Sequence, residues 1–168
     1  MKTLFADGPD PRYAPEIDEF GRLAGAWRTR ITCHPTDGAP PYSVNGASEF
    51  GYALDGRAVI DVWRRPARED APADGRAPDQ ESGLCVRIWD PRLQLWRFTF
   101  HGTAHGDAVH MYAHRIGDEI VMERAHGGTL VRWIFADVTA DAFHWRNERS
   151  TDGGHTWHLD QEVHARRR

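Results

Sequence analysis

Residues 143–163 read FHWRNERSTDGGHTWHLDQEV, and this stretch decides the fold class. Two segments of alternating apolar and polar residues flank Gly153 and Gly154, and glycine readily takes the positive φ angles that tight hairpin turns require. Side chains alternate between the two faces of a strand, so Phe143 and Trp145 share one face of the first segment. The stretch therefore predicts a β-hairpin.

The turn of this hairpin carries a second signal. Residues 150–157 spell Ser-x-Asp-x-Gly-x-Thr-Trp, which resembles the Asp-box hairpin of sialidases. In that family the motif is structural and recurs once in each propeller blade, whereas here it occurs once in a chain too short for a usual propeller. We therefore expect Asp152 to bond the amides of the turn, and sialidase activity does not follow.

Length and composition indicate one domain with no nucleic-acid or membrane partner. The chain has 168 residues and a net charge of −4, which suits a single core and gives no reason to expect nucleic-acid binding. No apolar run approaches a membrane span, and residues 1–11 lack the hydrophobic segment of a signal peptide. Cys33 and Cys85 have no metal or redox spacing. We expect a cytoplasmic protein with free thiols.

A short helix is expected before the strands. Between residues 15 and 24, apolar side chains recur at helical spacing, and acidic residues lie near the start, where the helix dipole favours them. Gly25-Ala26-Trp27 then opens a strand that runs to about His34. Residues 1–14 are expected to form an N-terminal extension, and residues 15–168 a single domain.

The rest of the chain predicts short strands joined by turns. Asp55-Gly56 and Gly127-Gly128 are typical hairpin connections. Counting the strand after the helix and the two in the hairpin, about ten strands in meander order are expected. The others cover residues 43–54, 57–65, 83–89, 93–101, 108–113, 119–124 and 129–136. This spacing indicates an all-β sandwich or an antiparallel up-and-down β-barrel, and the helix with Gly-x-Trp favours the barrel.

A helix followed by Gly-x-Trp on the first strand resembles the lipocalin and wider calycin families. In those families the tryptophan plugs the closed end of the barrel, and the resemblance implies that role for Trp27. The sequence LAGAW at residues 23–27, together with residues 143–157, also resembles a bacterial lipocalin-like family of uncharacterised function. This resemblance covers about residues 15–166 and implies the fold far more firmly than an activity.

One connection breaks the regular spacing of the strands. Residues 66–82 are rich in proline, alanine, aspartate and arginine and have no apolar periodicity. Such a segment cannot bury enough surface to fold alone, so we expect a flexible surface loop. The alternative is a lid over the barrel mouth, because long loops in compact domains are often functional.

Several strands are apolar on both faces, so alternation alone does not settle which face is inside. We expect the aromatic face to point inward, together with the charged residues Asp61, Arg87 and Glu123. The predicted ligand-binding residues on that face are Trp63, Trp89, Trp96, Phe98, Trp133, Phe135 and Trp145. The alternative places aliphatic residues inside and would leave the rings exposed unless a partner subunit covered them.

Flat rings and a few charges in an apolar barrel are typical of a small-molecule pocket. An unpaired interior charge would cost several kcal/mol, so Asp61 and Arg87 should either form an ion pair without a further role or meet a ligand. The first hypothesis is therefore the binding of a small apolar or aromatic molecule.

Other functions are kept beside it. One is a cofactor-independent cyclase, isomerase or dehydratase of specialised metabolism, with Asp61, Glu123 and Arg87 as catalytic groups. Another is a structural protein that associates through an exposed sheet face, for example as a homodimer.

No metal and no cofactor are expected. His101 and His105, like His110 and His114, are four residues apart, which on a strand separates the side chains by ~13 Å, too far to share a metal. Only a turn over residues 102–107 could bring the first pair together. Haem is the alternative cofactor, since nitrobindin-like barrels of the calycin group bind it through an imidazole, but no motif assigns the ligand. A solvated outer face is expected for His158, Asp160, Glu162 and His164.

Overall fold

The computed structural model describes residues 4–70, 80–104, 106 and 108–168. Within these ranges ten antiparallel strands close into a barrel in meander order, and β1 pairs with both β2 and β10. The predicted lipocalin-like up-and-down barrel with a short N-terminal helix is confirmed. The strands are β1 (Gly25–Cys33), β2 (Tyr42–Ala53), β3 (Ala58–Arg65), β4 (Glu81–Asp90), β5 (Leu95–Gly102), β6 (Ala108–Ile116), β7 (Glu119–His126), β8 (Thr129–Ala136), β9 (Ala142–Ser150) and β10 (His158–Arg167).

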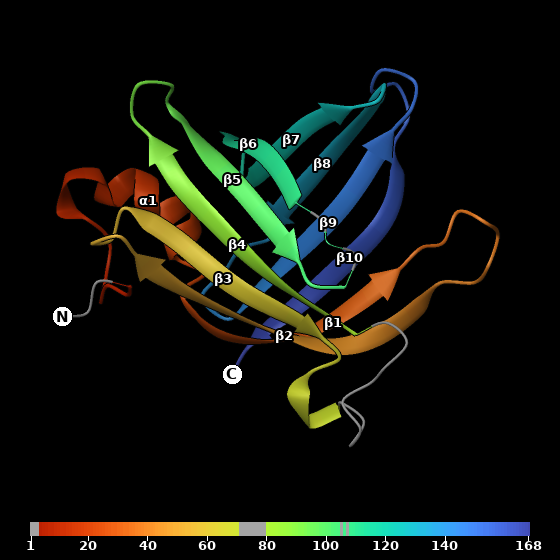
Figure 1. Ribbon diagram of the computed structural model, residues 1–168, viewed down its shortest axis with the longest axis horizontal. Helices are drawn as coiled ribbons and strands as arrows, with labels where there is room; N and C mark the ends of the chain where they lie inside the picture. Colours follow the sequence, from red (N-terminus) through yellow and green to blue (C-terminus); the bar gives the residue numbers. More distant parts are fainter. Residues whose placement is uncertain (1–3, 71–79, 105, 107) are drawn as a thin grey trace.

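Helix α1 (Ala14–Gly21) covers one end of the barrel, which we call the closed end. Its side chains Ile17 and Phe20, together with Leu23 just after the helix, are completely buried, because apolar residues three apart lie on one face of a helix. Figure 1 shows α1 at the end opposite the β1–β2 and β9–β10 connections. Within the described ranges, no helix is long and apolar enough to span a membrane.

Trp27 joins this helical segment to the barrel. Its indole N–H donates to the carbonyl of Leu23 at 2.7 Å, and the guanidinium of Arg167 lies 4.2 Å from its ring centre. Arg167 also donates to the carbonyl of Ala24 at 2.7 Å. Trp27 is completely buried and its ring centre lies 4.9 Å from that of Phe143. The prediction that this tryptophan plugs the closed end is confirmed.

The residues before α1 pack against the β2–β3 hairpin. Ala6 forms an isolated bridge with Tyr52, and the amide of Asp10 donates to the carbonyl of Gly56 at 3.1 Å. The buried carboxylate of Asp10 accepts the amide of Arg12 at 3.0 Å and so caps the short 3₁₀ helix η1 (Pro11–Tyr13). These bonds hold the described part of the N-terminal extension at the closed end.

The connection between β3 and β4 is described only at its two ends. Arg68–Asp70 forms a short 3₁₀ helix, η2, and the amide of Ala67 donates to the carbonyl of Asn45 at 3.0 Å. Strand β4 begins at Glu81, two residues before the predicted start. Residues 71–79 lie outside the described part of the chain, and the flexible-loop and lid predictions for that segment therefore stay predictions.

The β9–β10 turn forms as the sequence predicts. The amide and the hydroxyl of Thr156 donate to the carboxylate of Asp152 at 2.9 and 2.6 Å. The hydroxyl of Ser150 donates to Asp152 at 2.7 Å and accepts the amide of Gly154 at 2.8 Å. Because the bonds from Thr156 and Ser150 favour the charged carboxylate, they lower the pKa of Asp152 to about 2.

Replacing Asp152 with asparagine should lower the melting temperature by an amount that depends on pH. Folding lowers the pKa of Asp152 from 3.8 to about 2, so its stabilising contribution is complete above 3.8 and disappears as the pH falls through 2. The difference in melting temperature between wild type and Asp152→Asn should therefore shrink between these two pH values, as thermal melts followed by circular dichroism will measure. Asp118→Asn, at an exposed turn, is the control. A difference that stays constant down to pH 2 would contradict the assignment.

Candidate functional site

The barrel encloses a cavity of about 240 Å³. This volume lies just below the ~300–1,000 Å³ of most ligand pockets. Aromatic residues are the largest group in the wall, and the rings that line it include Phe50, Phe98, Phe100, Trp133, Phe135 and Trp145. The site is therefore an apolar chamber with room for a compact molecule.

The aromatic face of the strands points inward, as expected. Trp63, Phe98, Trp133, Phe135 and Trp145 were predicted as ligand-binding residues, and all of them line the cavity. The ring of Trp133 meets two others edge to face, with its centre 5.5 Å from that of Phe98 and 5.6 Å from that of Trp145. Such contacts hold the rings in place and leave flat surfaces for a ligand.

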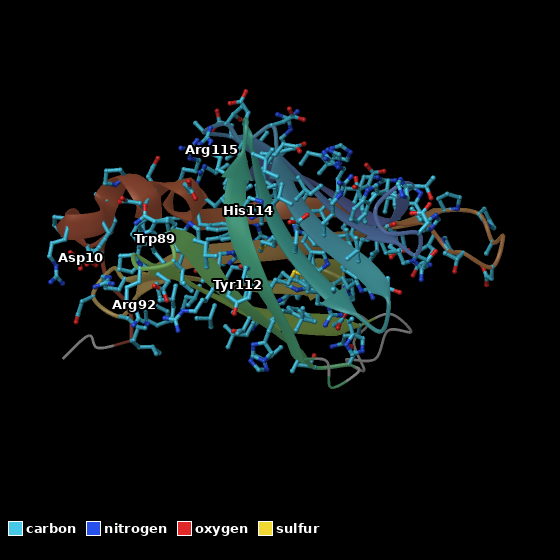
Figure 2. The ribbon with its side chains drawn as sticks, turned by 90° about the horizontal axis from the view of Figure 1, so that it is seen from above. Asp10, Trp89, Arg92, Tyr112, His114 and Arg115 are labelled. Carbon is cyan, nitrogen blue, oxygen red and sulfur yellow. The ribbon has the colours of Figure 1, made fainter. Side chains whose placement is uncertain are left out.

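Trp89 and Trp96 lie elsewhere, and the prediction that they line the cavity was wrong. They form a cross-strand pair between β4 and β5 with ring centres 5.8 Å apart. The indole N–H of Trp96 donates to Glu19 of α1 at 2.9 Å, and its ring meets the edge of Phe20. Figure 2 shows Trp89 near α1. Both rings pack at the closed end, because the helix fills the space that a ligand would need.

A buried ion pair lies in the wall of the cavity. Arg87 donates through Nη1 to Oδ1 of Asp61, and the two side chains are only 2% and 4% exposed. The guanidinium centre of Arg87 lies 4.9 Å from the ring centre of Phe20, 5.1 Å from that of Phe98 and 5.5 Å from that of Phe50. The ring faces favour the cation, so Arg87 sits between the helix and the chamber.

The ion pair sets the charge of the groups around it. Burial opposes the charge on Arg87, but the carboxylate of Asp61 outweighs this, and the pKa of Arg87 lies above its ordinary value. Burial, and then Asp61, raise the pKa of the neighbouring Cys85 thiol well above its ordinary value, so Cys85 stays neutral and is a poor nucleophile. The Nε–H of Arg87 has no acceptor among the described residues. It is therefore a donor that a ligand oxygen could satisfy.

Glu123 lies outside the barrel, and its predicted place among the interior charges was wrong. Met122 pairs with Trp133 across β7 and β8 and points inward, so Glu123 points outward beside Arg132. Its side chain is half exposed, and its oxygen lies 3.9 Å from Nε2 of His114, which projects from the outer face of β6 (Figure 2). The error arose because Ile120–Met122 is apolar throughout, so alternation does not choose a face.

Polar side chains line the cavity at the end away from α1, which we call the mouth. Arg65 and Glu81 form an ion pair at 3.4 Å where β3 ends and β4 begins. The indole N–H of Trp133 donates to Oδ1 of Asn147 at 3.0 Å, and Gln161 completes the polar lining. Most of these side chains are partly exposed, so the mouth gives a ligand access to the chamber.

Sequence reasoning did not include Arg65, Glu81, Asn147 and Gln161 in the site. Charged and amide side chains at strand ends are usual on any soluble barrel, and nothing in their spacing separated them from the outer surface. Sequence reasoning also missed Gly83, which borders the rings of the cavity. A Cβ there would overlap the rings of Trp63 and Phe100, which stack with their centres 6.3 Å apart.

Comparisons with known proteins bear on the architecture. No family model matches the sequence, and no curated protein is similar to it. Among solved structures, the S-type phycobiliprotein lyase CPES from Guillardia theta is similar, with a TM-score of 0.56, 13% sequence identity and 89% of each chain covered. At this identity the likeness shows the fold alone, a lipocalin-like barrel.

Arg87→Met should destabilise the protein by about 3–5 kcal/mol, because it leaves Asp61 buried without a partner. The double variant Asp61→Leu/Arg87→Met replaces the pair with apolar groups of similar size and should recover most of that loss. Urea unfolding measures both. Arg97→Met removes a solvent-exposed partner of Asp90 and, as a control, should cost less than about 1 kcal/mol. A double variant as unstable as Arg87→Met would show that the ion pair itself is required.

Proposed function

We propose that this protein binds a compact, flat and mostly apolar molecule, such as an aromatic metabolite, inside the barrel. The observation that carries the proposal is a chamber walled by aromatic rings whose interior charges are already paired. The resemblance of the chain to a bacterial lipocalin-like family, and its likeness in fold to a phycobiliprotein lyase, support a role centred on this cavity.

The charges in the wall favour a ligand without net charge. Arg87 is paired with Asp61, and Arg65 with Glu81, so the described residues of the wall carry no surplus charge that an ion would neutralise. Moving an ionised ligand from water into such a space would cost desolvation free energy, and no unpaired charge in the described wall would compensate it. The Nε–H of Arg87 nevertheless offers one hydrogen bond, which suits a ligand with a carbonyl or hydroxyl oxygen at its buried end.

The shape of the cavity favours rings over chains. Its walls present aromatic faces and edges, and offset stacking on such surfaces stabilises a planar molecule beyond simple burial of area. At about 240 Å³ the chamber suits one ring or a fused pair of rings better than a long lipid. The amide groups of Asn147 and Gln161 at the mouth would then contact polar substituents at the outer end of the ligand.

Trp133→Leu should weaken ligand binding roughly tenfold, because ring contacts contribute about 0.5–1.5 kcal/mol beyond buried area. Candidate ligands are found by titrating the intrinsic tryptophan fluorescence with a panel of aromatic and aliphatic metabolites. Trp157→Leu is the matched control, since Trp157 lies outside the chamber, where its ring contacts the guanidinium of Arg132 at 3.8 Å. A ligand whose affinity falls equally in both variants is not bound in the cavity.

The second candidate is a cofactor-independent cyclase, isomerase or dehydratase. It is favoured by Asp61 and Arg87, which bring a carboxylate and a guanidinium to the cavity wall. A carboxylate so placed can move a proton, and a guanidinium beside it can stabilise developing negative charge. Glu123 takes no part in this proposal, because it lies outside the barrel.

A cytoplasmic location and a homodimer also stay predictions.

If the protein is such an enzyme, Asp61→Asn should abolish conversion of a ligand found in the fluorescence screen while the ligand still binds. Product formation is followed by liquid chromatography and mass spectrometry, and binding by fluorescence on the same samples. Glu123→Gln is the control and should convert the ligand at the wild-type rate. Undiminished conversion by folded Asp61→Asn protein would remove Asp61 from the mechanism.

A further inference from the structure

A compact group of metal-ligating side chains lies on the outer surface of the barrel, on the other side of the sheet from the cavity. His144 of β9 and His164 of β10 are directly opposite each other across the two strands. Glu162 precedes His164 by two residues and therefore shares its face. Among the described residues, one potential ligand atom from each of these three side chains lies within 4.8 Å of the other two.

The distances around Glu162 suit a coordination site. Oε2 of Glu162 lies 3.1 Å from Nε2 of His144 and 3.5 Å from Nε2 of His164. Tetrahedral zinc with bonds of ~2.0–2.1 Å separates its ligand atoms by about 3.3 Å, so both distances already match the edge of such a tetrahedron. The two imidazoles stack in parallel, with their ring centres 4.4 Å apart and their planes 1° apart, so at least one ring rotates when both Nε2 atoms bind one ion.

The carboxylate is held by a third histidine. Nε2 of His34 lies 3.2 Å from Oε1 of Glu162, the oxygen that the other two histidines leave free. Ligating carboxylates in metalloproteins are themselves hydrogen-bonded in this way.

The surroundings leave room for a cation and for solvent. Arg146, on the same face of β9, is paired with Glu119 at 2.9 Å and Glu148 at 3.0 Å, which compensates its charge. Arg30, the cross-strand neighbour of His164 on β1, is exposed to solvent. The side chains of His144 and Glu162 are 19% and 23% exposed, and that of His164 is 63% exposed. Water can therefore reach an ion held between them.

We propose that His144, Glu162 and His164 bind a divalent transition-metal ion of the zinc type on the outer face of β9 and β10, with water completing the coordination. Two imidazoles and one carboxylate favour Zn²⁺, Co²⁺ and Ni²⁺ over Ca²⁺ and Mg²⁺, which prefer oxygen ligands. His34 is a positioning residue that orients the carboxylate. The site is separate from the barrel cavity, so the proposed metal binding does not depend on the proposed ligand binding.

Isothermal titration of the untagged full chain with Zn²⁺ tests the proposal. We expect saturable binding with one ion per chain, at least tenfold weaker in His144→Ala and in Glu162→Gln. His110→Ala removes an exposed histidine from the outer face of β6 and is the matched control, expected to bind as wild type does. Circular dichroism and thermal melts of each variant show that it is folded, and His164→Ala, at the most exposed position, provides a third variant should His144→Ala not fold.

The outcomes separate clearly. Absence of Zn²⁺ binding by the wild type, or binding that His164→Ala and Glu162→Gln leave unchanged, would overturn the site. Visible absorption of the Co²⁺-loaded protein gives a second readout, because tetrahedral and octahedral Co²⁺ differ in intensity. Strong tetrahedral bands that disappear in Glu162→Gln are expected, and binding of Ca²⁺ at the same residues in preference to Zn²⁺ would contradict the ligand chemistry.

Discussion

Closure of one end of the barrel by α1 and Trp27 is the constraint on which the rest of the structure depends. The buried face of the helix, the indole bond to the Leu23 carbonyl and the contact with Arg167 from the last strand bring the two termini of the fold together at that end. Apolar packing there leaves no room for a ligand. The cavity is therefore confined to the part of the barrel between the packing under α1 and the polar side chains of the mouth.

This arrangement explains where the interior charge lies. Arg87 lies where the packing under α1 meets the chamber, among phenylalanine rings and beside Asp61. An ion pair in such a place rarely adds net stability, because desolvation offsets the attraction. It does fix polar atoms at a defined point among the aromatic rings, and that is what distinguishes a binding chamber from an ordinary core.

The sequence was most informative where local chemistry decides the structure. The β9–β10 turn follows from Ser150, Asp152 and the adjacent glycines, whose bonds all lie within a few residues. The role of Trp27 followed from the resemblance of the helix and Gly-x-Trp to the lipocalin families. In the first case the stabilising bonds join near neighbours in the sequence, and in the second the motif marks the closed end of lipocalin barrels, so pattern and structure agree.

The parts that failed depend on register and depth, which single strands do not encode. Glu123 was assigned inward from an apolar run, although Gly127-Gly128, read as a two-residue hairpin loop, sets Glu123 opposite Arg132 and so on the outer face. Trp89 and Trp96 point into the barrel as expected, but they lie at its closed end, under the helix, and not along the cavity. The grouping of His144 with His164 requires the β-bulge between Leu159 and Gln161, which shifts the pairing of β9 with β10.

The two cysteines report on different levels of the structure. Cys33 lies near the mouth, within 3.4 Å of Arg65 and 3.5 Å of Gln161, and is partly accessible. Cys85 is enclosed beside the ion pair and held in its neutral form. Cys85 faces only the chamber, so a small thiol reagent should modify Cys33 first and reach Cys85 through the mouth, which makes the ratio of the two rates a measure of access to the cavity.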